Sequence, residues 1–274
     1  MLRVVLAILI ALAIALPVRA AEATERIERT FTIEKEDGQR TVAIDNVSGS
    51  IEVAPASGDA VELVLVQTWR GRNDAEVARA KAAVVLEVHE ELGRLVLKQG
   101  GSWRCHGRSS CDNHDYDVDF AWTLRVPDDV GLDLGNVNGG RIHVKGGAGH
   151  VMAKHVNGPV EIDDASGIVD ARTVNGRVTA TFSTAPKLAL SFGTVNGSID
   201  LTFPKDLDSN IEFSTVNGEL FTDFEYTTAL PNEAPNNALA RLLKGSGKMY
   251  IRIGDGGAPI RCETVNGNIT IHSR

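Results

Sequence analysis

The sequence predicts an all-β fold: a β-solenoid, built of β-helix-like coils of about 18–21 residues, with an irregular N-terminal β portion and one short helix. Three observations lead to this prediction. The tripeptide Val-Asn-Gly occurs six times, and apolar residues alternate with polar ones on both sides of each copy. Glycine is frequent, at 27 of 274 residues, whereas aromatic residues make up only 5%. Short strands joined by tight turns explain this pattern better than long helices do.

Residues 1–20 are predicted to be a signal peptide. Arg3 precedes an unbroken apolar run over residues 4–16, Pro17 ends that run, and Val18 and Ala20 are the small pair that a signal peptidase reads. The apolar run is too short for a membrane span, which needs about 20 residues. We therefore expect cleavage after Ala20, no membrane span in the mature chain, and an exported protein of the periplasm or the cell surface.

The composition restricts the class of partner. Hydrophobic residues make up 43% of the chain and charged residues 23%, which is compatible with a folded core. The formal charge is −8, and it becomes −10 when Arg3 and Arg19 leave with the signal peptide. An acidic chain without a basic run argues against nucleic acid and anionic membrane surfaces as partners.

Residues 21–130 are expected to form the N-terminal β portion of the repeat domain. The segment 47–53 (Val-Ser-Gly-Ser-Ile-Glu-Val) reproduces the phase of the later repeats, and residues 61–69 alternate like a long strand. A short helix is expected over residues 75–83, capped by Asn73 and Asp74. A hairpin is expected to join residues 84–89 to 94–98 through a turn at 91–93.

Two cysteines lie in the polar stretch 105–120. Because the chain is expected to be exported, Cys105 and Cys111 are predicted to form a disulfide that holds this loop. The alternative is a metal site, in which His106 and His114 join the two cysteines as zinc-type ligands. The spacing of the four residues matches no standard zinc finger, so we assign no metal and no cofactor.

Three carboxylates follow the cysteines. Asp115, Asp117 and Asp119 alternate with apolar residues, which on a strand places all three on one face. We expect a solvated strand face that discourages edge-to-edge aggregation. Calcium binding by these oxygens is the alternative, although the loop lacks the glycine of an EF-hand.

Residues 131–274 contain the repeats, with an insertion at about 223–248. The glycines of successive copies are 19, 18, 21, 21 and 49 residues apart, and the last spacing indicates one repeat interrupted by the insertion. Apolar residues stand seven and five places before each glycine, and two and four places after it, as Ile199 and Leu201 do after Gly197. The exceptions are Thr222 after Gly218 and the first copy, where the extra Gly140 shifts the phase by one residue and predicts a bulge. Each copy therefore predicts two strands joined by a turn, each strand with one buried face.

The six turns supply the candidate site residues, and their predicted role is structural. Asn-Gly is expected to provide the positive φ that a sharp corner requires, and the valine before it is expected to face the core. The asparagine amides are expected to form a ladder by bonding backbone groups of adjacent coils. Thr173, Thr194, Thr215 and Thr264, which precede four of the valines, are also expected to be structural. The turn residues are Asn138, Gly139, Asn157, Gly158, Asn175, Gly176, Asn196, Gly197, Asn217, Gly218, Asn266 and Gly267.

A β-sandwich is the alternative fold. Asn-Gly is also the strongest short signal for a hairpin with a type I′ turn. We favour the solenoid because hairpins give no reason for a valine before every turn. Cys262 stands at an inward position of the last repeat, so we expect a buried thiol that neither reacts nor pairs with the other cysteines.

The chain resembles a family of bacterial exported proteins, described as β-strand-repeat or putative-adhesin proteins, that carry a domain of unknown function. The resemblance covers roughly residues 40–274. It is carried by the repeated Thr-Val-Asn-Gly-x-Ile turns, by residues 124–127 (Leu-Arg-Val-Pro) and by residues 254–260 (Gly-Asp-Gly-Gly-Ala-Pro-Ile). It implies a solenoid-like fold in the cell envelope, and it brings no catalytic residues.

The sequence contains no Gly-x-Ser-x-Gly, His-Glu-x-x-His or phosphate-loop motif. We therefore predict a non-enzymatic, exported structural or binding module of the bacterial cell envelope, adhesin-like, whose partner is an envelope protein or a glycan. One alternative is a carbohydrate-active enzyme on a β-helix scaffold, in which Asp163, Asp164, Asp170 and Asp200 would cluster. The other is a divalent-metal-binding module.

Overall fold

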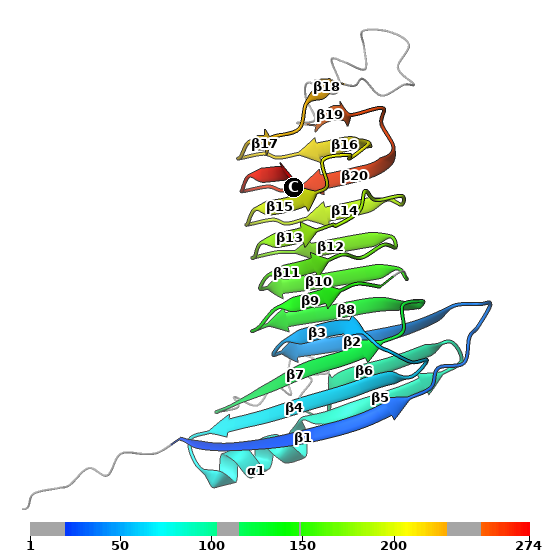
Figure 1. The fold of residues 1–274 in the computed structure, drawn as a ribbon. Helices are drawn as coiled ribbons and strands as arrows, with labels where there is room; N and C mark the ends of the chain where they lie inside the picture. The colour runs from blue at the N-terminus through cyan, green and yellow to red at the C-terminus, as the bar shows by residue number, and fades with distance from the viewer. Residues whose placement is uncertain (1–19, 103–114, 148, 229–247) are drawn as a thin grey trace, which may run out of the picture.

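The computed structural model describes residues 20–102, 115–147, 149–228 and 248–274 (Figure 1). These residues form two large mixed sheets and one helix. The 10-stranded sheet contains, in spatial order, β1 (Ala21–Phe31), β4 (Val61–Gly71), β7 (Tyr116–Val126), β3 (Ile51–Pro55), β9 (Ile142–Lys145), β11 (Val160–Asp163), β13 (Val178–Thr181), β15 (Ile199–Phe203), β21 (Ile269–Ser273) and β17 (Leu220–Thr222). The 11-stranded sheet contains β18 (Tyr226–Thr228), β19 (Lys248–Ile253), β16 (Ser209–Ser214), β20 (Ala258–Glu263), β14 (Leu190–Gly193), β12 (Val169–Thr173), β10 (Val151–Asn157), β8 (Val130–Asn138), β2 (Arg40–Ser48), β6 (Arg94–Gly100) and β5 (Val85–Glu91).

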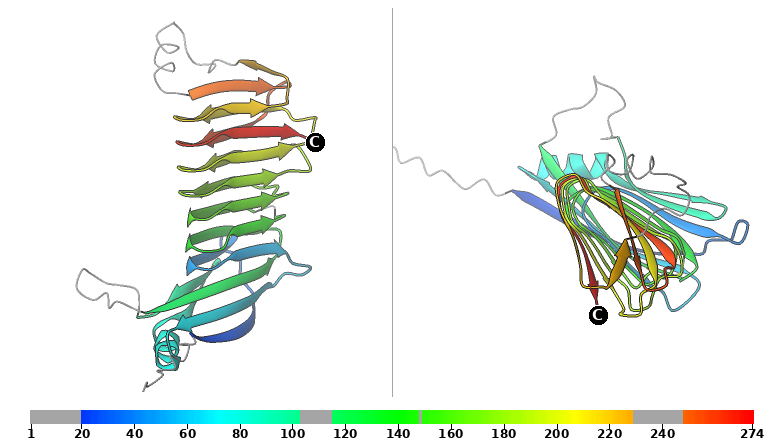
Figure 2. Two further views of the ribbon diagram at one scale, coloured as in Figure 1. Left: turned by 90° about the vertical axis from the view of Figure 1, so that its left-hand side faces the viewer. Right: turned by 90° about the horizontal axis from the view of Figure 1, so that it is seen from above.

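Each repeat contributes one strand to each sheet, and we call such a pair a rung. The rungs of the repeats are β8–β9, β10–β11, β12–β13, β14–β15, β20–β21 and β16–β17. Strands of neighbouring rungs run parallel and in register, so that Val169 lies between Val151 and Leu190 (Figure 2). Hairpin strands are antiparallel, and the type I′ hairpin interpretation of these turns is therefore wrong. Neither sheet closes on itself within the described residues.

The core lies between the two sheets. Val178 and Ala180 of β13 are fully buried, whereas Thr179 and Thr181 between and beyond them point outward. Phe182 stacks on Phe203 with ring centroids 5.1 Å apart, in a geometry that aromatic pairs favour. The predicted alternation of buried and outward residues is confirmed in the repeat strands, except in the short last strand β17, where the inward positions are only partly buried.

The last repeat in the sequence is not the last rung of the stack. The strand β20 lies between β14 and β16, and β21 lies between β15 and β17. After β17 the chain continues through β18 and the insertion, returns as β19, which pairs antiparallel with β16, and then enters the gap between two earlier rungs. The insertion therefore also changes the order in which rungs stack.

The N-terminal residues form a wider base beneath the rungs (Figure 1). The strands β1, β4 and β7 pair antiparallel, and β5 and β6 form the predicted hairpin. The predicted helix is confirmed as α1 (Asp74–Ala83), with Asn73 Oδ1 accepting a hydrogen bond from Glu76 N at 3.0 Å. The segment around Ser48 forms the first rung, β2–β3, which pairs with β8 and β9.

Residues 1–19, most of the predicted signal peptide, lie outside the described residues. In the part of the chain that the structure describes, no helix has the length and apolar character needed to cross a membrane.

Candidate functional site

A groove of about 650 Å³ crosses the outer face of the 11-stranded sheet above β14. It exists because the outward residues at its floor, Ala189 and Ser191, are small, whereas the strands on either side carry longer side chains. The volume lies within the range of sites that hold small ligands. We call it the β14 groove; its outward lining residues are His150, Met152, Ile168, Asp170, Ala189, Ser191, Asn210, Glu212, Tyr250, Arg252, Pro259 and Arg261.

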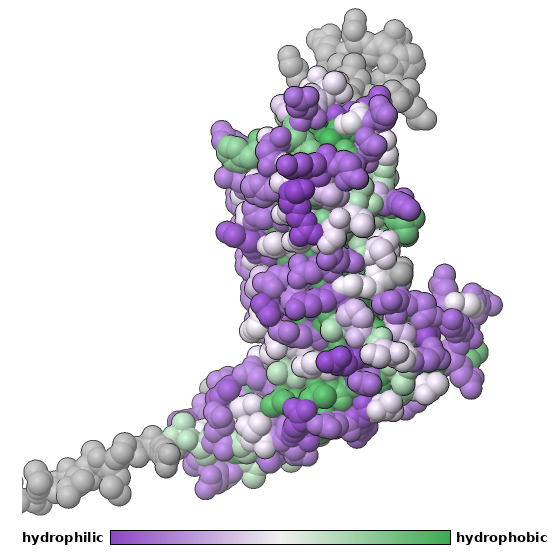
Figure 3. Space-filling view, viewed as in Figure 1, coloured by the Kyte–Doolittle hydropathy of each residue, from purple (hydrophilic) through white to green (hydrophobic). Residues whose placement is uncertain are grey.

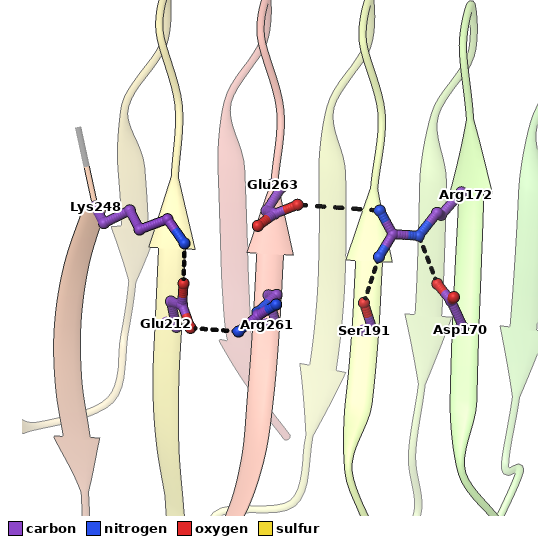
Figure 4. Close-up of polar contacts among 7 residues, drawn as sticks. All are labelled: Asp170, Arg172, Ser191, Glu212, Lys248, Arg261 and Glu263. Atoms are coloured by element: carbon purple, nitrogen blue, oxygen red, sulfur yellow. Dashed lines mark hydrogen bonds and ion pairs between the residues drawn. The ribbon is translucent and has the colours of Figure 1, made fainter. Parts of the chain in front are cut away.

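Arg172 bounds the groove at one end. Its side chain leaves β12 and crosses over β14 toward β20 (Figure 4). Nε donates to Asp170 Oδ1 at 2.7 Å, Nη2 donates to Ser191 Oγ at 3.0 Å, and Nη1 lies 3.9 Å from Glu263 Oε2. Gly193 leaves this path open: a Cβ there would meet Arg172 Cγ at 3.5 Å, an ordinary contact, whereas a longer side chain would occupy the path.

Glu212 anchors the opposite wall. Its carboxylate accepts hydrogen bonds from Lys248 Nζ at 2.7 Å and from Arg261 Nη2 at 2.9 Å (Figure 4). Burial by itself would raise the pKa of Glu212, but the hydrogen bonds from the two cations outweigh burial and hold this pKa below its ordinary value. The carboxylate is therefore ionised at neutral pH.

Apolar side chains complete the groove. Met152 and Ile168 lie on the side of β10 and β12, and Pro259 and Tyr250 lie on the side of β20 and β19. Ile168 is 46% exposed. Most of the stack surface visible in Figure 3 is hydrophilic, so an exposed apolar lining distinguishes the groove from a simple solvated sheet face.

The groove combines apolar contact area with fixed hydrogen-bonding groups. Asp170 and Glu212, the two carboxylates of the lining, are both paired with cations. A carboxylate held in this way is able to accept hydrogen bonds from a ligand, and the lowered pKa of Glu212 does not suit a general acid. These features make the groove a candidate binding site.

The four aspartates that the carbohydrate-active alternative requires do not come together. Asp163 contacts His143 on the 10-stranded sheet with an oxygen–nitrogen distance of 2.8 Å, whereas Asp170 lies on the opposite sheet with Arg172. Asp200 pairs with Arg177 at 3.3 Å and Asp164 accepts a hydrogen bond from Ser183 N. Each of the four aspartates thus has a separate partner.

The turn asparagines form an exposed ladder along one corner of the stack. Five of the six amide nitrogens donate to the Oδ1 of the asparagine one rung away, over 2.8–2.9 Å, and Asn138 at the end of the ladder accepts the first of these bonds. The predicted partners were backbone groups, and the partners in the structure are side chains, because in-register stacking places identical amides one strand spacing apart. The order along the ladder is Asn138, Asn157, Asn175, Asn196, Asn266 and Asn217.

The corner glycines have a different role from the predicted one. Of the six, only Gly139 (φ 73°) and Gly267 (φ 152°) have positive φ. At Gly176, Gly197 and Gly218 a Cβ would instead overlap the carbonyl group of the corner glycine on the neighbouring rung. Gly158 has the same restriction, since its Cβ would lie 2.8 Å from the carbonyl oxygen of Gly140. These four corners therefore require glycine because the stacked backbones approach closely, and not because φ is positive.

The valines of the turns face outward, and the prediction that they face the core is wrong. The strand alternation continues into the corner, so the residue before each valine takes the inward position. Thr173 Oγ1 donates to the Gly158 carbonyl oxygen at 2.8 Å, and Thr194 Oγ1 donates to that of Gly176 at 3.0 Å. Thr264 and Thr215 repeat this contact, which binds each rung to the next.

The cysteine loop falls mainly outside the described residues. Cys105, His106, Cys111 and His114 all lie there, so the predicted disulfide and its zinc alternative remain predictions. Asp119 is paired, because it accepts hydrogen bonds from Ser48 Oγ and Arg70 Nη1, both at 2.6 Å. Asp115 pairs with Arg72. Among the described residues no three His, Cys, Asp or Glu side chains are grouped closely enough to hold a metal ion.

Cys262 is fully buried on β20, and burial raises the pKa of its thiol above the ordinary value. It is a free cysteine, as predicted from its inward position.

Sequence reasoning missed the β14 groove. A signal was present: one repeat alone has small residues at three successive outward positions, Ala189, Ser191 and Gly193. The contributions of Glu212 and Tyr250 were not predictable in the same way, because they depend on β16 and β19 lying beyond the last repeat.

No protein-family model and no curated protein matches the sequence. Several solved structures resemble the fold. A putative cell adhesion protein from Clostridium sporogenes is 12% identical, with 91% of this chain and 100% of that chain covered, at a TM-score of 0.47. A putative adhesin from Bacteroides fragilis is 9% identical, with 91% and 97% covered, at 0.33. A putative lipid binding protein from Parabacteroides distasonis is 11% identical, with 91% and 96% covered, at 0.25. Likeness at this level carries no argument about function.

Proposed function

We propose that this protein is a non-enzymatic, exported binding module of the bacterial cell envelope, adhesin-like, that holds a glycan chain in the β14 groove. The observation that carries the proposal is the groove itself. An aromatic side chain, Tyr250, and apolar side chains such as Pro259 lie beside Asp170 and the ionised Glu212. Sugar rings present apolar faces and many hydroxyl groups, which match this mixture of surfaces.

Export and the solenoid class belong to the same proposal. The pattern of Arg3, an apolar run and the Val18–Ala20 pair supports export to the periplasm or the cell surface. The parallel, in-register order of the rungs supports classing the repeat region as a β-solenoid. A solenoid presents a long rigid face, which suits an extended ligand better than a compact one.

The test is a binding measurement with the mature chain and matched variants. The probes are an array of bacterial envelope glycans and, in parallel, activity assays on the same polysaccharides. Ser191→Trp fills the groove floor from an outward position, so the fold should be retained. Thr179→Trp is the matched control, because Thr179 is an outward, partly exposed residue of the 10-stranded sheet.

The expected result is glycan binding by the wild type and by Thr179→Trp, with at least a tenfold weaker affinity for Ser191→Trp. Turnover of a polysaccharide would contradict the non-enzymatic role. Binding that Ser191→Trp leaves unchanged would place the site elsewhere. Absence of glycan binding would leave an envelope protein as the ligand class and overturn the glycan proposal.

A further inference from the structure

The six turn valines form an exposed apolar stripe along one corner of the stack, beside the asparagine ladder. Five of them are 36–39% exposed and the last is 72% exposed. Strands are spaced about 4.8 Å apart, so six rungs give a stripe roughly 24 Å long. We call it the valine stripe; in stack order it contains Val137, Val156, Val174, Val195, Val265 and Val216.

A continuous apolar surface of this kind marks an interaction site more often than scattered exposed residues do. Beside the stripe lies a hollow of about 590 Å³, lined by five of the valines and by the next outward residues on the same strands. The valine stripe and the hollow thus lie side by side on one surface. An apolar surface of this kind is able to pack against a second copy of itself across a twofold axis, stripe against stripe.

The charges on both sides of the stripe change sign in the same direction. On the sheet side, the outward residues two places before the last five valines of the stripe are, in stack order, Lys154, Arg172, Gly193, Glu263 and Ser214. On the turn side, the residues that follow the corners of the six rungs are Arg141, Pro159, Arg177, Ser198, Asn268 and Glu219. Along the stripe, the positive residues of both flanks lie on the rungs nearer the base and the negative residues on the rungs nearer the far end; beyond the stripe the sheet-side column continues with Asp45 toward the base and Lys248 toward the far end.

We propose that the valine stripe is the contact surface of an antiparallel homodimer. A twofold axis in the contact plane and perpendicular to the stripe places each flank against its own reversed copy. Lys154 then faces Glu263 of the second copy, with Val174 and Val195 at the centre. Arg141, which also pairs with Glu52 and Glu161 of its own chain, faces Glu219 of the second copy. Opposite charges meet on both flanks.

The parallel arrangement is disfavoured by the same charges. A twofold axis along the stripe would oppose the two flanks of one rung, which brings Arg172 against Arg177 of the second copy.

Lys154 is exposed and has no ion pair with any described residue, so its charge is available to a partner. The stripe is short compared with a standard interface, and we therefore expect a weak dimer.

The test uses charge reversal and mixing of two variants. Lys154→Glu and Glu263→Lys each place like charges across the antiparallel contact, so neither variant should associate with itself. In a mixture the two variants restore both Lys–Glu contacts. Sedimentation velocity of the full mature chain, up to about 1 mM because small interfaces dissociate in the micromolar to millimolar range, measures the association.

Lys145→Glu is the matched control, because Lys145 is an exposed lysine on β9 of the other sheet. We expect the wild type and Lys145→Glu to dimerise, each single stripe variant to be at least tenfold weaker, and the mixture to recover. Val195→Asp should also prevent association. A wild type that stays monomeric throughout the range would overturn the proposal, and so would a dimer unaffected by Val195→Asp or a mixture that does not associate.

Discussion

At the scale of single residues, the spacing between neighbouring rungs decides which side chains the corner accepts. Gly176, Gly197 and Gly267 lie on successive rungs, and each carbonyl group occupies the place where the next residue would carry its Cβ. The threonine hydroxyls bond the same carbonyl groups from inside the stack. A corner therefore needs two residues together, a glycine that leaves space and an inward hydroxyl that satisfies the carbonyl oxygen.

Replacing Gly197 by alanine should destabilise the protein because the new methyl group overlaps the Gly176 carbonyl group. We expect a loss of about 1–3 kcal/mol in the free energy of unfolding, the usual cost of inserting a methyl group where backbones must shift. Urea denaturation measures this loss. Gly58→Ala is the control, since a Cβ there meets nothing within 4 Å. Equal stability of the two variants would contradict the steric role.

The sequence pattern predicts the direction of some side chains around the turns correctly and of others wrongly. The alternation around each turn correctly located inward residues such as Ile199 and Leu201. It misassigned the valines, because a tripeptide does not reveal whether alternation continues through the corner or restarts after it. The threonine before four of the valines indicates the correct direction. Its hydroxyl group satisfies a carbonyl group inside the corner, whereas a valine at that inward position would leave the carbonyl group unpaired.

At the scale of elements, the order of the rungs has a consequence for local stability. The strands β20 and β21 belong to the C-terminal residues of this sequence, but each is hydrogen-bonded on both edges. The strand β17 lies earlier in the sequence, but it pairs only with β21 among the described strands. Sequence position and structural position are thus reversed in this part of the chain.

Amide hydrogen exchange should reveal this reversal. Terminal residues usually exchange quickly because they fray, whereas strands paired on both edges exchange slowly. We expect the amides of β21 to be protected about as strongly as those of β13, and the amides of β17 to exchange faster than both. Exchange followed by peptide-level mass spectrometry distinguishes the three segments. Fast exchange in β21 together with slow exchange in β17 would indicate that rungs stack in sequence order.

This stacking order was not predictable from the repeats. All copies share one phase, so β14 accepts either β16 or β20 as its neighbour with the same inward residues; Ile211 and Ile260 are equivalent in this respect. The choice depends on β19, which pairs antiparallel with β16 and places the chain so that the last repeat returns inside the stack. The insertion length alone, read from the sequence, indicates an interruption and not a change of order.

At the scale of the whole molecule, the described residues connect the base and the far end of the stack only through the rungs between them (Figures 1 and 2). Hydrogen bonds and core contacts run from each rung to the next, which is the arrangement in which stability is a sum of neighbour interactions. The antiparallel base, by contrast, contains the longest strands of the molecule and the buried Trp69 and Trp122. The two ends should therefore respond separately to local damage.

The two buried tryptophans make this separation measurable. Phe213→Ala removes a buried ring from β16 at the far end, which typically costs about 3–5 kcal/mol locally. In a Trp103→Phe background, fluorescence reports the base through Trp69 and Trp122, whereas far-ultraviolet circular dichroism reports all strands. We expect Phe213→Ala to lower the urea midpoint seen by circular dichroism and to leave the fluorescence midpoint unchanged. Leu124→Ala, in the base, should lower the fluorescence midpoint. Equal shifts of both signals in Phe213→Ala would mean that the stack and the base unfold as one unit, because only full coupling transmits the loss of one terminal ring to the base.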